Sequence, residues 1–154
     1  IHRADESGST DAFQSYLDAA SEGVWPHDAG RTWHGTGDGS DGNDGVADDV
    51  IRTDGSISYV EWSFALERSL EFANIVTPAS KDPVRISPES VGKTISAATR
   101  AAQGNNLVLD DASFYTHAED GAYPIVLATY ELVCSKYPDA DTATVKAWAP
   151  YGLK

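Results

Sequence analysis

The first nine residues bring together side chains that could hold a small anion. Arg3 and Asp5 are followed by Ser7, Gly8 and Ser9, and an amphipathic helix is predicted directly after them. The first N–H groups of a helix lack intrahelical partners and carry a partial positive charge. A guanidinium and small hydroxyl residues beside such a helix start can hold a tetrahedral oxyanion. The spacing therefore predicts an anion site; the alternative is that Arg3 and Asp5 form an ordinary surface ion pair.

Other reactive side chains form weaker patterns. Asp38, Asp41 and Asp44 alternate with glycines but miss the EF-hand spacing, since no Gly stands at the sixth position and no Glu at the twelfth. The four histidines show no metal-ligand spacing, and the single cysteine, Cys134, gives a zinc site little support. A hydrolase that uses Ser7 would need the Gly-x-Ser-x-Gly turn, which the sequence lacks. We therefore expect no metal, no cofactor and no catalytic activity.

Composition narrows the possible partners. The 154 residues carry a formal net charge of −13 and are 41% hydrophobic, which suits one acidic domain with a full core. Nucleic acids and anionic membranes select basic surfaces, so we expect neither as a partner. No apolar stretch approaches the length of a membrane span. The chain contains no methionine, so we expect Ile1 to follow a cleavage, excision or omitted segment of a longer protein.

Helical and extended patterns alternate along the chain. Apolar residues at helical spacing predict helices near residues 10–20, 45–52, 61–73, 88–102 and 140–149. Short apolar or alternating runs predict strands at residues 1–3, 56–60, 75–77, 84–86, 107–109 and 123–134. This alternation is typical of an α/β domain with a largely parallel sheet.

Three local signals refine this pattern. Ser7 or Ser9 is the predicted cap of the first helix, and Ser87 is the cap of the helix that has Pro at its first position. Residues 24–44 form a long loop, either functional or a surface excursion that Trp25 and Trp33 pin to the domain. The first helix should pack through five residues: Ala12, Phe13, Tyr16, Leu17 and Ala20.

Several motifs, in one order, resemble a known family. Residues 3–9, Arg-Ala-Asp-Glu-Ser-Gly-Ser, resemble the Arg-x-Asp-x-Ser-Gly-Thr motif of the phosphate-binding protein of Pst-type ABC transporters. Trp33 follows, then Gly-Asn-Asp-Gly-Val at 42–46 and the run from Thr53 to Glu61. Tyr-Pro-Ile at 123–125 and Thr-Tyr-Glu at 129–131 complete the similarity. Because the motifs keep this order over most of the chain, the resemblance is far more specific than a lone Ser-Gly-Ser.

The resemblance implies a fold and a ligand. The fold would be the type II periplasmic-binding-protein fold, in which two α/β lobes clamp phosphate between them. This chain would be one lobe, with a mixed, mostly parallel sheet flanked by helices. Arg3 would contact phosphate, Asp5 would orient Arg3, and Ser7, Gly8 and Ser9 would donate hydrogen bonds from the helix start. Ser9 stands where the family motif has Thr, which keeps the hydroxyl.

The resemblance also bounds what this chain would contain. Family members are longer and begin with another lobe, so we expect residues 1–122 to be the second lobe and 123–154 a shortened return segment. The expected function is phosphate binding for uptake, with the ABC-transporter permease as partner of the parent protein, which would be periplasmic or secreted, or lipid-anchored at the cell surface. The alternatives are a processed secreted fragment with an interaction role and little phosphate affinity, or a phosphoester hydrolase. Without the first lobe, the apolar run 123–134 predicts self-association.

Overall fold

The fold combines a short parallel sheet with helices. The computed structural model describes residues 1–101, 103, 107–116 and 119–130. The strands β1 and β2 pair in parallel, with His2 opposite Gly39 and Arg3 opposite Ser40, and α2 contacts both. The predicted α/β class is therefore confirmed. The elements are β1 (His2–Arg3), α1 (Gly8–Ala20), β2 (Gly39–Ser40), α2 (Gly42–Arg52), α3 (Trp62–Glu67), α4 (Pro88–Ala97) and α5 (Ser113–Thr116).

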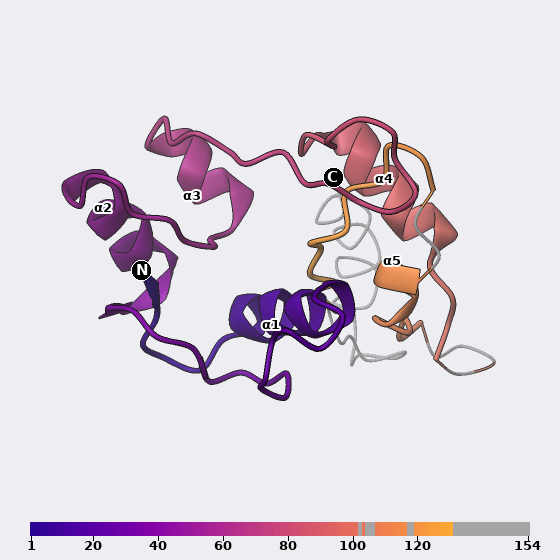
Figure 1. The fold of residues 1–154 in the computed structure, drawn as a ribbon, viewed down its shortest axis with the longest axis horizontal. Coiled ribbons are helices and arrows are strands. Elements are labelled where there is room, and N and C mark those ends of the chain that lie inside the picture. Colours follow the sequence, from indigo (N-terminus) through magenta and orange to yellow (C-terminus); the bar gives the residue numbers. More distant parts are fainter. Residues whose placement is uncertain (102, 104–106, 117–118, 131–154) are drawn as a thin grey trace, which may run out of the picture.

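The buried apolar residues lie at two ends of the domain. In Figure 1, α2 and α3 lie at one end, α4 and α5 at the other, and α1 lies between them. Val46 and Ala47 of α2 are fully buried at the first end, and Phe114 of α5 is buried at the second. The helix α1 contacts α5, where the Tyr115 hydroxyl donates to the carbonyl oxygen of Ala12 over 3.3 Å. Within the described residues, no helix combines the length and apolar character that crossing a membrane requires.

The buried face of α1 is more polar than its sequence pattern predicts. Thr10 and Gln14 are completely buried, whereas Ala20, expected in the apolar face, is exposed. The Gln14 amide Nε2 donates to the carbonyl oxygens of Gly30 and Thr32, both over 2.8 Å. Its Oε1 accepts the backbone N–H of His34 over 3.0 Å. The Gln14 side chain thus fixes the backbone of residues 30–34 in the loop that follows α1.

Aromatic packing holds the same loop against the domain. The ring of Trp33 lies 5.4 Å from the ring of Trp25, 6.2 Å from Phe13 and 5.5 Å from Tyr59. The loop is therefore pinned by its tryptophans, as one of the two interpretations predicted. Its last residues form β2, which places the loop end beside β1.

Several predicted helices occur with shifted ends. The helix α2 begins at Gly42 instead of residue 45, and α4 ends at Ala97 instead of near residue 102. The predicted helix 61–73 is reduced to α3, which has six residues. It stops because Ser69 adopts φ 54°, and the N–H groups of Ser69 and Leu70 then bond to the carbonyl oxygens of Leu66 and Ala65. This is a Schellman C-cap, which usually has Gly at the left-handed position.

Most predicted strands lack a partner strand among the described residues. Residues 75–77 and 84–86 contribute only the bridge between Ile75 and Val84, and 107–109 only the bridge between Leu109 and Arg100. Residues 56–60 form no ladder, yet they lie beside the chain start, because the Ile1 ammonium donates to the Ile57 carbonyl oxygen over 2.9 Å. Residues 123–130 are irregular. The rest of the predicted strand 123–134 and the predicted helix 140–149 lie outside the described residues.

Removing the Gln14 amide should destabilise the domain. Gln14→Leu would leave two carbonyl oxygens and one N–H without their partner, and each such group costs roughly 1–3 kcal/mol when it stays buried. Because the loop can partly open to water, we expect a loss of about 3 kcal/mol in the free energy of unfolding, measured by urea denaturation. The control Asp18→Ala changes an exposed residue of the same helix. Equal losses in the two variants would contradict the anchoring role of Gln14.

The contact between α1 and α5 predicts a loss of stability at alkaline pH. Burial, with the nearby charges of Asp111 and Asp11, raises the pKa of Tyr115 to about 12, whereas an unfolded tyrosine titrates near ~10. Above pH ~10 the unfolded chain therefore releases this proton first, so the free energy of unfolding should fall from pH ~10 to ~12. Urea denaturation across this range measures the fall, which Tyr115→Phe should reduce. An unchanged slope in Tyr115→Phe would refute this linkage.

Candidate anion-binding site

The start of α1 presents backbone donors that the fold leaves unused. Ser7 has extended backbone angles (φ −145°, ψ 149°), and its Oγ accepts the Thr10 N–H over 3.0 Å. Of the two predicted caps, Ser7 is therefore the correct one. The N–H groups of Gly8 and Ser9, and the Ser9 hydroxyl, have no hydrogen-bond partner among the described residues. Three donors at the positive end of a helix are thus available to a ligand.

Arg3 offers a pair of N–H groups beside this helix start. Its Nε and Nη2 donate to the two carboxylate oxygens of Asp5 over 2.7 and 2.5 Å, and its Nη1 donates to the Asn43 Oδ1 over 3.1 Å. A guanidinium has five N–H groups. Bonds to described residues therefore leave one N–H on each terminal nitrogen, a fork that suits two oxygens of one oxyanion. The Arg3 side chain is 11% exposed, so little freedom remains for it to turn away.

Asp5 fixes the guanidinium and links β1 to α2. Its Oδ1 also accepts the N–H of Gly42, the first residue of α2, over 3.1 Å. The hydrogen bonds from Arg3, and then the one from Gly42, hold the pKa of Asp5 well below its usual range. In turn the Asp5 carboxylate raises the pKa of Arg3 above its ordinary value. Both shifts favour the ionised forms of the pair, as an orienting carboxylate requires.

Tyr59 joins Arg3 to the start of α1. The Tyr59 hydroxyl accepts the Arg3 backbone N–H over 3.3 Å and lies 2.7 Å from the Thr10 Oγ1. The Thr10 Oγ1 lies 2.7 Å from the Ser7 Oγ. Arg3 and Asp5 are therefore bonded directly to each other. The hydroxyls of Tyr59 and Thr10 link the Arg3 backbone to Ser7, and Gly8 and Ser9 follow Ser7 at the start of the helix.

Sequence reasoning missed the residues that support this site. Gly42 and Asn43 lie in one of the motifs that carry the family resemblance and Tyr59 in another, but the pattern assigned them no role. Thr10 was expected only as the start of the helix. Their position within the ordered motifs was the available signal, since a local pattern cannot show that residues 40 to 56 positions away bond to Arg3.

Leu127 lies over the same helix start. A Cβ atom placed on Gly8 would lie 3.4 Å from a methyl carbon of Leu127, which shows how closely that side chain approaches. The irregular segment 123–130 therefore passes the anion site, with Leu127 against the first turn of α1. A side chain at residue 8 would compete with Leu127 for this space, which gives Gly8 a packing role in addition to its free N–H.

The start of α4 is also capped, and its hydrogen bonds can be compared with those at the start of α1. At α4 the Ser87 Oγ accepts the Ser90 N–H over 3.0 Å, and the Ser90 Oγ accepts the Ser87 N–H over 2.9 Å. Pro88 occupies the first helical position and has no N–H. Thr10 is the residue of α1 that corresponds to Ser90. Its Oγ1 lies 2.7 Å from the Ser7 Oγ and 2.7 Å from the Tyr59 hydroxyl oxygen. At α1 the N–H groups of Ser7 and Thr10 are also used, by the Arg31 carbonyl oxygen and the Ser7 Oγ. The two helix starts therefore differ at the first helical position, where Gly8 has an N–H that is free among the described residues and Pro88 has no N–H.

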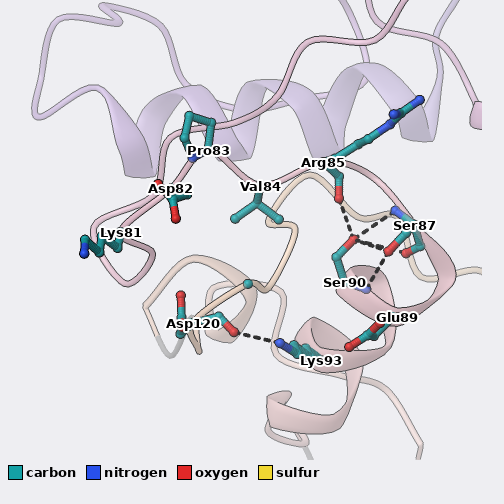
Figure 2. Close-up of a pocket in the computed structure, with 11 residues that line it drawn as sticks. Lys81, Asp82, Pro83, Val84, Arg85, Ser87, Glu89, Ser90, Lys93 and Asp120 are labelled. Carbon is teal, nitrogen blue, oxygen red and sulfur yellow. Dashed lines mark hydrogen bonds between the residues drawn. The ribbon is translucent and has the colours of Figure 1, made fainter.

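A cavity of about 430 Å³ lies beside α4, away from the predicted site. Figure 2 shows Lys93 at its lower edge donating to the carbonyl oxygen of Asp120 over 2.9 Å, and the Arg85 side chain pointing away. Its three basic residues are balanced by three acidic ones, so it offers no net attraction to an anion. In the part of the chain described here, no three His, Cys, Asp or Glu side chains are placed to hold a metal ion. The lining residues are Lys81, Asp82, Pro83, Val84, Arg85, Ser87, Glu89, Ser90, Lys93, Asp120 and Gly121.

Comparison with known proteins places the chain in a family. A family model described as a PBP superfamily domain matches residues 1–153. The chain belongs to the PBP superfamily. The resemblance that the ordered motifs indicated is thereby confirmed across nearly the whole chain, including segments that carry none of those motifs.

Three similar curated proteins are named phosphate-binding proteins. The chain is 57% identical over 150 residues to phosphate-binding protein PstS 3 of Mycobacterium leprae, covering 96% of this chain and 41% of that protein. It is 56% identical over 145 residues to phosphate-binding protein PstS 2 of Mycobacterium tuberculosis, with 94% and 39% covered. Phosphate-binding protein PstS of Xylella fastidiosa is 34% identical over 145 residues, with 91% and 38% covered. The chain thus spans about two fifths of the length of these relatives.

The Asp5 carboxylate should contribute stability that disappears in acid. Its folded-state pKa is lowered by Arg3 and Gly42, whereas an unfolded Asp titrates near ~3.9. The contribution is therefore present above pH ~3.9 and is lost as the pH falls through the folded-state value. Asp5→Asn should lower the free energy of unfolding by less than about 1 kcal/mol near neutral pH, because the pair is partly exposed to solvent.

Urea denaturation of both proteins as a function of pH measures this contribution. The difference between wild type and Asp5→Asn should be constant near neutral pH and should shrink below pH ~4. Asp18→Asn, at an exposed position of α1, is the matched control. A difference that grows as the pH falls would show that Asp5 is not stabilised as a carboxylate.

Proposed function

We propose that this chain is one lobe of a phosphate-binding protein and that the start of α1, with Arg3, binds inorganic phosphate. The observation that carries the proposal is the set of hydrogen-bond donors at the start of α1 and on Arg3, two segments that Tyr59 and Thr10 link. Arg3, oriented by Asp5, supplies a two-pronged fork, Gly8 and Ser9 supply backbone N–H groups, and Ser7 and Ser9 supply hydroxyls. Phosphate has the charge, size and several acceptor oxygens that such a set requires. The names of the relatives support the same ligand.

The proposed site is incomplete by itself. The chain covers 41% of PstS 3 of Mycobacterium leprae, and we propose that a region corresponding to the rest supplies a second lobe and further phosphate ligands. In such a longer protein, residues 1–122 would form the lobe described here and 123–154 the return towards the other. We further propose that the protein is exported, acts at the cell surface or in the periplasm, and delivers phosphate to an ABC-transporter permease.

Binding without turnover is the proposed chemistry. The Ser7 Oγ accepts the Thr10 N–H as a helix cap and lies 2.7 Å from the Thr10 Oγ1. Among the described residues no histidine bonds to it, so it has no general base of the kind that activates a nucleophile. Its surroundings suit a donor to an anion and offer nothing that would cleave a phosphoester.

The isolated lobe should bind phosphate weakly. Each charge-assisted hydrogen bond contributes on the order of 1.5–3 kcal/mol, but a single lobe leaves the anion half solvated. Loss of translational freedom and the field of a chain with net charge −13 both oppose binding. We therefore expect millimolar-class affinity, which is about 4 kcal/mol or less. Self-association through the run 123–134 remains a separate prediction, which analytical ultracentrifugation of the chain would measure.

The test is an NMR titration of the chain with inorganic phosphate. The amide signals of Gly8 and Ser9 should shift with a millimolar-class dissociation constant, and Arg3→Ala should abolish these shifts because the fork is removed. Arg52→Ala is the matched control, since Arg52 is an exposed arginine at the end of α2 with a 65% exposed side chain. A chromogenic phosphoester added to the same sample should not be hydrolysed.

The outcomes separate phosphate binding from its alternatives. Shifts of Gly8 and Ser9 that sulfate reproduces with equal affinity would show a general anion site instead of a phosphate site. No shifts with either anion would refute binding by this lobe. Micromolar affinity that Arg3→Ala abolishes would refute the half-site argument and show that a second copy of the chain completes the site.

A further inference from the structure

We propose that Asn43 is a positioning residue of the anion site, and that the site needs its neutral amide because the amide holds Arg3 without adding a negative charge. This inference rests on the proposed phosphate function, and Asn43 is not among the residues proposed to contact phosphate. Asn43 is the second residue of α2 and is half-buried. Its Oδ1 accepts an N–H of the Arg3 Nη1 over 3.1 Å. A guanidinium can only donate, so the direction of this bond is fixed.

The start of α2 holds both members of the Arg3–Asp5 pair. The Gly42 N–H donates to the Asp5 Oδ1 over 3.1 Å, and the next residue, Asn43, accepts from Arg3. Asp5 itself accepts from the Arg3 Nε and Nη2. The guanidinium is thus held at all three nitrogens, by a carboxylate at two and by an amide at the third. Without Asn43, the described residues would hold it along one edge only.

The positive charge of Arg3 is already opposed by two carboxylates. The hydrogen bond from Arg3 to Asp5, and to a smaller extent the charge of Glu61, raise the pKa of Arg3. A bound phosphate would be a further anion beside the same guanidinium. A carboxylate at residue 43 would be a third one, placed next to the N–H groups that remain for the ligand, and it would repel phosphate. An amide oxygen supplies the same acceptor without a net charge.

Stability by itself would favour aspartate at residue 43. The first turn of a helix stabilises a negative charge, and a carboxylate would bond to Arg3 more strongly than an amide does. The next residue, Asp44, is such a carboxylate, and its Oδ1 accepts from Arg68 over 2.7 Å instead of from Arg3. The neutral side chain therefore stands at the position that contacts Arg3, where an anion site needs an acceptor without a charge.

The experiment compares Asn43→Ala with Asn43→Asp. Phosphate titrations at constant ionic strength and near-neutral pH are followed by the amide signals of Gly8 and Ser9. Asn43→Ala removes one hold on Arg3 and should weaken binding several-fold. Asn43→Asp keeps the size and the acceptor, yet it should weaken binding by about tenfold or more because of its charge. Urea denaturation of Asn43→Asp should have a midpoint at or above that of wild type, so stability and binding should change in opposite directions.

Two controls isolate the local effect. Asn74→Asp makes the same change of charge at an exposed position outside the site and should leave binding unchanged. The side-chain Nε–H signal of Arg3 should persist in both variants of Asn43, because Asp5 still accepts this group. A persistent signal shows that a loss of binding does not come from loss of the Arg3–Asp5 pair.

Each result has a distinct meaning. Wild-type affinity in Asn43→Asp or in Asn43→Ala, with binding still abolished by Arg3→Ala, would overturn this inference and leave the phosphate site intact. Equal losses in Asn43→Asp and Asn74→Asp would also overturn it, because net charge would then be the cause. An Asn43→Asp variant that does not fold would contradict the bond to Arg3 on which the inference depends. If wild type itself does not bind phosphate, the proposed function fails, and the inference fails with it.

Discussion

The fold depends on satisfying two polar side chains that α1 buries completely, Thr10 and Gln14. A buried polar group costs free energy unless it finds a partner, so these two side chains determine what can pack beside the helix. The Gln14 side chain makes three hydrogen bonds to the backbone of the loop after α1. Further along the chain, this loop leads into β2. Thr10 selects Tyr59, which lies beside the chain start. One helix face therefore contacts both the loop that leads to β2 and the residues of the proposed anion site.

The proposed site consists of hydrogen-bond donors that have no partner among the described residues. At α4 a reciprocal cap between Ser87 and Ser90 and a proline at the first position use or remove most of the orphan donors. At α1 the third helical residue turns its hydroxyl inward, and the first two N–H groups stay open. Arg3 also keeps free donors. Asp5 and Asn43 accept three of its five guanidinium N–H groups, so within the described residues one N–H remains free on each terminal nitrogen. In a chain with net charge −13, the proposed anion site would depend on such directional bonds, because the overall field repels anions.

Some errors in the sequence-based prediction have one common cause. Residues 56–60, 75–77 and 84–86 have the alternating or apolar pattern of strands, yet a strand is defined by hydrogen bonds to a neighbour that the pattern does not reveal. Ile75 and Val84 find each other for a single bridge, and residues 56–60 lie beside β1 without forming a ladder. The early end of α3 has a different origin, since Ser69 accepts a left-handed conformation that the propensities of Ser do not predict. In the first case a neighbouring strand is missing among the described residues, and in the second a local left-handed turn ends the helix.

By itself the sequence determined the α/β class, the cap at Ser87, the choice of Ser7 or Ser9 as a cap, and the grouping of Arg3 and Asp5 with a helix start. These features depend on residues within a few positions of each other, where side-chain type and spacing decide the geometry. Only the tertiary structure decided that Ser7 is the cap, that Gly42 and Asn43 brace the Arg3–Asp5 pair, and that Tyr59 completes the link to Thr10. These contacts join residues 37 to 56 positions apart. They form because buried donors and acceptors must be paired, a condition that holds for the folded chain as a whole and for no single segment of it.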